Sequence, residues 1–308
     1  MAWTRKDLLG LQDMTAEEIG EILHNAKILK HVLTQNNKKT PHLQGKSVVT
    51  LFYENSTRTR MSFELASKYM SAASANIAAA ASSVSKGETL IDTGRTLDMM
   101  GTDVIIIRHP MAGAPHLLAR HVQASVINAG DGMNEHPTQA LLDLFTIQEK
   151  KGKIDGLKVA IVGDIAHSRV VRSNIWGLLA MGASVRLFAP STLMPMEIGK
   201  TGAHVAGSLE EAVADADAVM ALRIQKERQQ NGLFPTVREY ARFFGIGQET
   251  MRLAKPDALI MHPGPINRGV EMMSDVADAP QSVINEQVMN GVAVRMALLF
   301  LYTRRGQV

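Results

Sequence analysis

Short β-rich runs alternate with helical segments along the chain, and this alternation constrains the fold more than any other feature of the sequence. Such an alternation is typical of parallel sheets covered by helices on both faces. The chain is therefore predicted to be α/β, with two doubly wound parallel-sheet domains. Strands are expected at 47–52, 104–107, 125–129, 158–162, 184–188, 218–222 and 258–261, and helices at 59–70, 88–100, 114–121, 137–150, 169–181, 209–214 and 285–304.

The length of 308 residues exceeds that of a usual single domain, so two domains are expected. The segment 150–156 is charged, contains glycine and lies between a predicted helix and a predicted strand, which makes it the best candidate boundary. Thr15 and Glu18 form a capping-box pair before the opening helix. The final helix is long and has an amphipathic pattern, and the residues alone leave open on which domain it packs.

Composition narrows the classes of function. The 33 Lys and Arg are scattered among 30 Asp and Glu, and only 5% of the chain is aromatic, which argues against nucleic-acid binding. The absence of cysteine excludes disulfides, thiolate catalysis and cysteine-bound zinc. The start of the chain is charged, and no apolar run reaches the length of a membrane span. A cytoplasmic protein with no membrane partner, no cofactor and no metal is expected.

The strand expected at 47–52 leads into Ser56, Thr57, Arg58 and Thr59, where a helix is expected to start. Free N–H groups at a helix N-terminus carry partial positive charge and bind phosphate well. Hydroxyl groups and a guanidinium add further donors for phosphate oxygens. The alternative is an ordinary helix cap, which serine and threonine often supply. The segment lacks the glycines and lysine of a Walker loop.

Arg108, His136 and Gln139 follow this segment in chain order. Arg108 ends the strand expected at 104–107, where ligands bind in open parallel sheets. A single histidine is usually structural, but His136 precedes a proline at a helix start, with Gln139 three residues on. Together with Ser-Thr-Arg-Thr-Arg at 56–60, these residues resemble the carbamoyl-phosphate signature, the His-Pro-x-Gln motif and a strand-end arginine of the aspartate and ornithine transcarbamoylases. The resemblance covers essentially the whole chain.

The resemblance implies a carbamoyl-phosphate site and a role for each matching residue. Thr59, Arg108 and His136 would donate to the carbonyl oxygen, on which negative charge builds when an amine attacks. Gln139 would address the amide, and His-Pro-Gly-Pro at 262–265 would accept hydrogen bonds from it. The expected catalytic residues are Arg58, Thr59, Arg108 and His136. The expected carbamoyl-phosphate contacts are Ser56, Thr57, Arg58, Thr59, Arg108, His136, Gln139, Gly264 and Pro265.

The segment 82–89 contains three serines and Lys86 before Gly-Glu-Thr. Composition alone favours a flexible polar loop with a solvated lysine. The resemblance instead implies a loop that crosses a subunit interface and contributes Lys86 and a serine to a neighbouring site. The spacing permits Ser82 or Ser83 as that serine, and Ser83 is favoured. A homotrimer with shared active sites is implied in the same way.

The second half of the chain is expected to choose the amino acid. The segment 163–169 lacks two glycines of a dinucleotide fingerprint, and it resembles the family segment whose arginine, here Arg169, binds an aspartate carboxylate. Arg223 and Gln225 resemble the aspartate-binding loop, although composition alone fits a solvated charged loop equally well. Lys86, Arg169, Arg223 and Gln225 are the expected aspartate contacts. The ornithine enzymes carry Ser-Met-Gly and His-Cys-Leu-Pro segments, which this chain lacks.

The resemblance therefore implies transfer of the carbamoyl group from carbamoyl phosphate to L-aspartate, in de novo pyrimidine biosynthesis. Residues 1–135 are expected to form the carbamoyl-phosphate domain, with the C-terminal helix 290–308 packed back on it, and 136–289 the aspartate domain. A catalytically inactive scaffold subunit, a basic nucleic-acid-binding protein and a transcarbamoylase with another amino-acid acceptor are the alternatives. Regulatory or dihydroorotase partner chains, allosteric effectors and higher oligomers are left open by the sequence.

Overall fold

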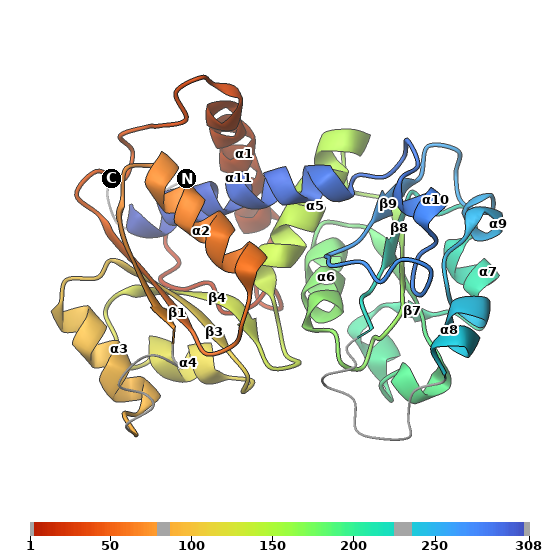
Figure 1. Cartoon of the computed structure of the whole chain (residues 1–308), viewed down its shortest axis with the longest axis horizontal. Helices are drawn as coiled ribbons and strands as arrows, with labels where there is room; N and C mark the ends of the chain where they lie inside the picture. The colour runs from red at the N-terminus through yellow and green to blue at the C-terminus, as the bar shows by residue number, and fades with distance from the viewer. Residues whose placement is uncertain (1–2, 79–86, 225–235, 305–308) are drawn as a thin grey trace. The chain divides into compact units, whose positions relative to one another are not determined.

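The computed structural model describes residues 3–78, 87–224 and 236–304, and the chain divides into two compact units (Figure 1). Unit 1 consists of residues 1–142 and 289–308, and unit 2 of residues 143–288. Two helices, α5 (Pro137–Lys151) and α11 (Ile284–Thr303), contain the points at which the chain passes from one unit to the other.

Unit 1 is built on a four-stranded parallel sheet with the order β2-β1-β3-β4. Its strands are β1 (Ser47–Phe52), β2 (Ala73–Ala78), β3 (Val104–His109) and β4 (Ser125–Asp131). Strand β2 was not predicted, because its sequence Ala-Ser-Ala-Asn-Ile-Ala has a single β-branched residue, and alanine and asparagine, which are depleted in strands, make up most of the rest. Pairing with β1 over all six residues makes it a strand.

Helices cover both faces of this sheet. They are α1 (Ala16–Lys30), η1 (His31–Thr34), α2 (Thr57–Tyr69), α3 (Leu90–Met99) and α4 (Ala114–Ala119). Alternate residues of β1 and β3, among them Leu51 and Ile107, form one buried cluster with Leu97 of α3 and Leu118 of α4. Figure 1 shows α1 and α2 on the other side of the sheet. Successive side chains of a strand point to opposite faces of the sheet, so each strand can pack against a helical layer on either side.

Unit 2 contains a five-stranded parallel sheet with the order β7-β6-β5-β8-β9. Its strands are β5 (Lys158–Val162), β6 (Ser184–Phe188), β7 (His204–Val205), β8 (Ala218–Ala221) and β9 (Leu259–Met261). The short edge strand β7 is exposed and was not predicted, since two residues carry no periodic signal. The remaining helices are α6 (Arg169–Ala180), η4 (Ser191–Leu193), η5 (Ile198–Thr201), α7 (Leu209–Val213), α8 (Val237–Phe243), α9 (Gln248–Met251) and α10 (Ser274–Ala277).

Both units are parallel α/β, so the predicted fold class is confirmed. In unit 2, apolar residues of β5, β8 and β9 pack against α7, α9 and α10 in one buried cluster. Figure 1 shows α6 on the opposite side of that sheet.

Helix α11 differs from its predicted amphipathic pattern. Residues 293–299 are buried without interruption, including Arg295, which is 4% exposed. The part of the helix that belongs to unit 1 is surrounded: the Ser125 hydroxyl donates to the Tyr302 carbonyl, and the Arg295 guanidinium lies over the Phe63 ring of α2. A helix buried on all sides needs apolar residues all round, which a one-sided pattern does not provide.

Within residues 3–78, 87–224 and 236–304, no helix has the length and apolar character needed to cross a membrane. The same described part of the chain holds no group of three or more His, Asp or Glu side chains arranged to bind a metal ion.

Candidate active site

The carboxyl ends of β1, β3 and β4 bring three of the predicted motifs to one edge of the unit 1 sheet. Phe52 at the end of β1 pairs with Arg108 in β3, and the Tyr53 N–H donates to the Arg108 carbonyl at 2.9 Å. His109 of β3 pairs with Asp131 at the end of β4. Parallel strands all end on the same side of a sheet, which is where open α/β sheets bind ligands.

Helix α2 starts at this edge, two residues earlier than predicted. Ser56 is its N-cap residue, in extended conformation, and its side chain makes no capping hydrogen bond. Thr57 and Arg58 in the first turn are exposed, whereas Thr59 is 7% exposed. The first N–H groups of a helix have no acceptor within it, so this turn presents backbone donors together with hydroxyl and guanidinium groups.

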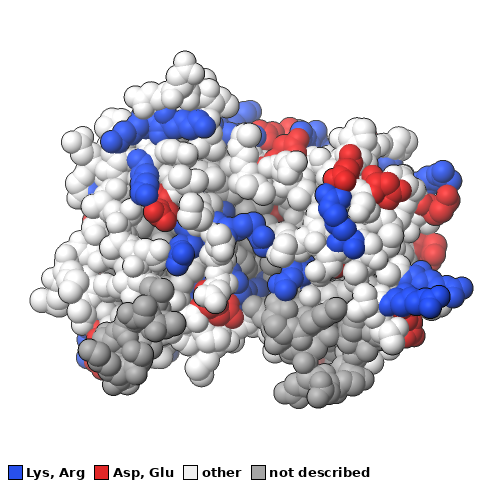
Figure 2. Space-filling model, in the orientation of Figure 1, with Lys and Arg blue, Asp and Glu red and all other residues white. Residues whose placement is uncertain are grey.

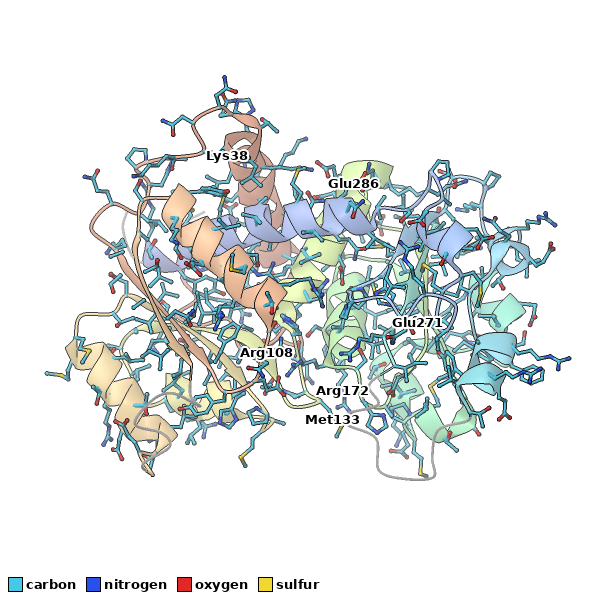
Figure 3. All side chains as sticks on the ribbon, viewed as in Figure 1. Lys38, Arg108, Met133, Arg172, Glu271 and Glu286 are labelled. Atoms are coloured by element: carbon cyan, nitrogen blue, oxygen red, sulfur yellow. The ribbon has the colours of Figure 1, made fainter. Side chains whose placement is uncertain are left out.

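Arg108, which Figure 3 labels, contacts the end of β4 and a carboxylate that follows β1. Its Nη1 donates to the Ala129 carbonyl of β4 at 3.2 Å, and its Nε lies 3.2 Å from Glu54 Oε2. The Arg108 and Glu54 side chains are 14% and 21% exposed, so the pair is only partly screened by solvent. Glu54 was missed by the sequence analysis, because nothing local marks a carboxylate after β1 as the partner of an arginine in β3.

His136 is buried and stands directly before α5. The turn that leads to it is closed by Asp131, whose Oδ1 accepts from Asn128 Nδ2 at 2.8 Å and from the Glu135 N–H at 3.1 Å. Asp131 Oδ2 accepts from the Gly113 N–H at 2.7 Å. A fully buried carboxylate with several N–H donors fixes the backbone that presents His136.

A second contact to His136 comes from α5 itself. Thr138 Oγ1 lies 3.5 Å from His136 Nδ1, and Arg295 Nη2 donates to Thr138 Oγ1 at 3.4 Å. Arg295 also donates from Nη1 to the Gly291 carbonyl at 3.0 Å. Arg295, a buried arginine of α11, is thus connected to His136 through a single residue, Thr138. The sequence analysis missed it, since Arg295 lies 159 positions after His136 in the chain.

Tyr53 and His109 form an aromatic pair at the same edge, with ring centroids 4.6 Å apart. Burial raises the pKa of Tyr53 and lowers the pKa of His109, in each case because the charged form is poorly solvated. His109 Nδ1 accepts from the Met111 N–H at 3.0 Å, which requires an unprotonated Nδ1. Both rings are therefore neutral near pH 7.

In unit 2, the segments that follow the neighbouring strands β5 and β8 carry Arg169 and Arg223, two of the residues predicted to bind aspartate. Gly163 follows β5 with φ 136°, and a Cβ there would lie 2.9 Å from both Cβ and O of Leu222. The chain then makes a turn in which His167 contacts the buried Asp164 at 2.8 Å, and Arg169, 3% exposed, begins α6. Arg223 lies just after β8, half-buried.

The turn 262–265 follows β9, the neighbour of β8. The Gly264 N–H donates to His262 Nδ1 at 2.8 Å, and the Gly264–Pro265 peptide bond is cis. His262 Nε2 lies 3.3 Å from Oε1 of Glu271, which Figure 3 labels, and both side chains are fully buried. The ring therefore caps the turn on one side and contacts a carboxylate on the other.

Gln139 is half-buried in the first turn of α5, close in sequence to His136. Ser83, its alternative Ser82, Lys86 and Gln225 lie outside the described residues.

Two family models match the chain in succession. The carbamoyl-phosphate-binding domain of aspartate/ornithine carbamoyltransferase matches residues 6–149, and the Asp/Orn-binding domain of the same family matches residues 155–302. This chain belongs to the aspartate/ornithine carbamoyltransferase family. The matched ranges contain every residue at the two strand edges described above.

Relatives within the carbamoyltransferase family are similar over nearly their full length. The chain is 71% identical to the aspartate carbamoyltransferase catalytic subunit of Acetivibrio thermocellus, over 97% of this chain and 96% of the relative. It is 69% identical to the catalytic subunit of the same name from Ruminiclostridium cellulolyticum, over 98% and 96%.

Solved carbamoyltransferase structures with either acceptor share the fold. Aspartate transcarbamoylase of Trypanosoma cruzi, in complex with carbamoyl aspartate and phosphate, superposes with a TM-score of 0.85 at 32% identity, over 97% of this chain and 96% of that one. Ornithine carbamoyltransferase of Pyrococcus furiosus gives a TM-score of 0.88 at 32% identity, over 100% and 99%. The fold is therefore that of the carbamoyltransferase family, and it does not distinguish aspartate from ornithine as the acceptor.

The two edges suit carbamoyltransferase chemistry by the kinds of group that they present. Unit 1 offers N–H, hydroxyl and guanidinium donors, which suit a phosphate and a carbonyl that gains negative charge. Unit 2 offers two arginines in the segments that follow neighbouring strands, Arg169 at the start of α6 and Arg223 after β8. On the face drawn in Figure 2, basic and acidic side chains occur in small separate groups, without one continuous basic field.

Proposed function

We propose that this carbamoyltransferase moves the carbamoyl group of carbamoyl phosphate to the amine of L-aspartate, giving N-carbamoyl-L-aspartate and phosphate in pyrimidine biosynthesis. The observation that carries the proposal is the pair of Arg169, at the start of α6 after β5, and Arg223, just after the neighbouring strand β8. Aspartate has two carboxylates, and an arginine fork suits each of them. The names of the relatives at 71% and 69% identity support the same acceptor.

At the edge of unit 1, the first turn of α2 would bind the phosphate group through Ser56, Thr57 and Arg58. Thr59, Arg108 and His136 would donate to the carbonyl oxygen, and they stabilise the tetrahedral transition state more than the ground state. Loss of one such donor typically lowers the rate about 10²–10³-fold. The ion pair of Arg108 with Glu54 supports this role, since a preoriented donor needs no rearrangement during the reaction.

The remaining substrate contacts are assigned to the second half of the chain, to Gln139, and to Ser83 and Lys86. The aspartate would be bound by Arg169, Arg223 and Gln225. The backbone of Gly264 and Pro265 would accept hydrogen bonds from the carbamoyl amide, and Gln139 would be the other contact of that amide. Lys86, with Ser83, would reach the site from a neighbouring subunit of a homotrimer. Orientation of both reactants is worth ~7–11 kcal/mol in favourable cases, so a covalent intermediate is unnecessary.

The same proposal assigns the two substrates to two domains, 1–135 with 290–308 for carbamoyl phosphate and 136–289 for aspartate. Two compact units and two successive family matches support this division. The protein would act in the cytoplasm on small-molecule substrates, without nucleic acid.

The proposal is tested by measuring phosphate release from carbamoyl phosphate with each acceptor. Purified protein should release phosphate in proportion to added L-aspartate and form carbamoyl aspartate in equal amount. L-Ornithine at the same concentration should give release no faster than carbamoyl phosphate alone. Release that depends on ornithine, with citrulline as product, would reassign the acceptor.

A further inference from the structure

A carboxylate fully buried in unit 2, that of Asp143 in α5, connects three helices. Its Oδ1 accepts from Gln287 Nε2 of α11 at 2.8 Å, and its Oδ2 accepts from Asn174 Nδ2 of α6 at 2.9 Å. Gln287 is 3% exposed and Asn174 is fully buried, so water does not compete for these contacts.

The carboxylate determines how both amide groups are turned. A carboxylate only accepts hydrogen bonds, so each neighbouring amide must direct its nitrogen toward Asp143. The Gln287 oxygen then points away, and it accepts from the His262 N–H at 3.0 Å. The second N–H of Asn174 donates to the Val170 carbonyl, one helical turn earlier, at 3.1 Å.

His262 is the first residue of the turn 262–265. Its backbone is held by Gln287, and its ring accepts from the Gly264 N–H at 2.8 Å. Asp143 therefore acts on Gly264 through two side chains, Gln287 and His262. The second oxygen of Asp143 accepts from Asn174 and so anchors α6, the helix that begins with Arg169.

We propose that Asp143 is a positioning residue, which sets the orientation of the Gln287 amide and thereby places the Gly264–Pro265 backbone for the carbamoyl amide. The inference rests on the proposed function for the identity of the substrate, but the hydrogen-bond relay itself does not. The relay predicts that activity depends on which group donates and which accepts in each hydrogen bond, and not on the size and polarity of the side chains alone.

The test uses Asp143→Asn, Gln287→Glu and the double variant that combines them. Asparagine at 143 can accept from only one of the two amides, so one of them loses its bond or turns round. Gln287→Glu alone places two carboxylates against each other, and the contact is repulsive. In the double variant, the new amide donates to one oxygen of the new carboxylate, and the other oxygen still accepts the His262 N–H.

Asp143→Asn should lower kcat/KM for aspartate roughly tenfold to a hundredfold, as expected when a buried hydrogen bond to a charged group is lost. Gln287→Glu alone should also lower kcat/KM for aspartate, and the double variant should recover most of the loss of each single variant. The affinity for inorganic phosphate, assigned to the first turn of α2 in unit 1, should stay within about twofold of the parent protein. This difference separates positioning from general damage.

Amide hydrogen exchange at His262 gives a second measurement that needs no substrate. The relay predicts faster exchange in Asp143→Asn and in Gln287→Glu, and protection restored in the double variant. A double variant that exchanges as fast as the single variants, or that does not fold, overturns the proposal. A parent protein that does not carbamoylate aspartate would instead refute the proposed function, and the exchange result would still decide the relay.

Discussion

Arg223 is the residue whose removal should best separate the two substrates. Arg223→Ala leaves an aspartate carboxylate poorly paired, which at a half-buried position costs a few kcal/mol, about a hundredfold in KM for aspartate. The affinity for carbamoyl phosphate, measured by direct titration, should change little. Arg252→Ala is the matched control, since Arg252 is exposed and pairs with Glu249 on the surface of unit 2. Abolished carbamoyl-phosphate binding in Arg223→Ala would contradict the assigned roles.

His109 should make the protein less stable in mild acid. Burial lowers its pKa, so in the unfolded chain the histidine binds a proton at higher pH than in the folded one. Neutral His109 contributes in full to the free energy of unfolding above pH ~6.5, the pKa of the histidine in the unfolded chain. This contribution is lost as the pH falls through the lower pKa of His109 in the folded protein. His109→Asn keeps an acceptor for the Met111 N–H and should flatten the dependence on pH below ~6.5.

Urea unfolding at a series of pH values measures this effect. His24→Asn, at an exposed position of α1, is the control for the loss of one histidine. An unchanged slope in His109→Asn would show that His109 is not the group responsible.

The residue-level predictions rest on local signals. The hydroxyls and arginine at 56–59 and the His-Pro pair at 136–137 are recognisable from neighbouring residues, and the structure puts them with Arg108 at one sheet edge. Glu54 and Asp131 hold this edge through partners that lie 54 and 18 positions away in sequence. Such partners have no local signature.

At the scale of elements, Gly163 determines how closely β5 approaches the end of β8. Gly163→Ala should lower the free energy of unfolding by at least about 2 kcal/mol, because the new Cβ would lie 2.9 Å from Leu222 atoms at a backbone φ that L-residues rarely adopt. Gly156→Ala is the control: it also has positive φ, but no heavy atom lies within 4 Å of its Cβ. It should cost about 1–2 kcal/mol.

Urea unfolding of both variants measures the difference. The Gly163 variant should also raise KM for aspartate, since Gly163 leads into the segment that ends at Arg169. Equal stabilities of the two variants would mean that the close approach carries no energetic weight.

Elements were predictable from the sequence where hydrophobic period and caps agreed. Thr15 and Glu18 form the predicted capping box of α1, with the Thr15 N–H donating to Glu18 Oε2 at 2.9 Å. Strand β2 was missed because pairing with β1, a tertiary contact, overrides its weak propensity. The burial of α11 on all sides likewise depends on what surrounds it.

For the whole molecule, the proposed sharing of sites between subunits predicts complementation. Arg58→Ala and Lys86→Ala should each be nearly inactive if a site takes Arg58 from one chain and Lys86 from its neighbour. Unfolding the two variants together and refolding them assorts chains at random, so about a quarter of sites should be intact. Activity should rise to roughly a quarter of that of refolded wild-type protein. No recovery, with mixed oligomers confirmed by mass, would mean that Lys86 acts within its own chain.

The central claim is the bond that the protein makes, and isotope labelling tests it most directly. Carbamoyl phosphate labelled with ¹³C is supplied with equal concentrations of ¹⁵N-aspartate and δ-¹⁵N-ornithine, and the ¹³C spectrum is recorded. The account predicts a ¹³C–¹⁵N doublet for carbamoyl aspartate, one phosphate released per doublet formed, and essentially no citrulline signal. A citrulline doublet as the main product, or phosphate released without any ¹³C–¹⁵N coupling, would contradict it.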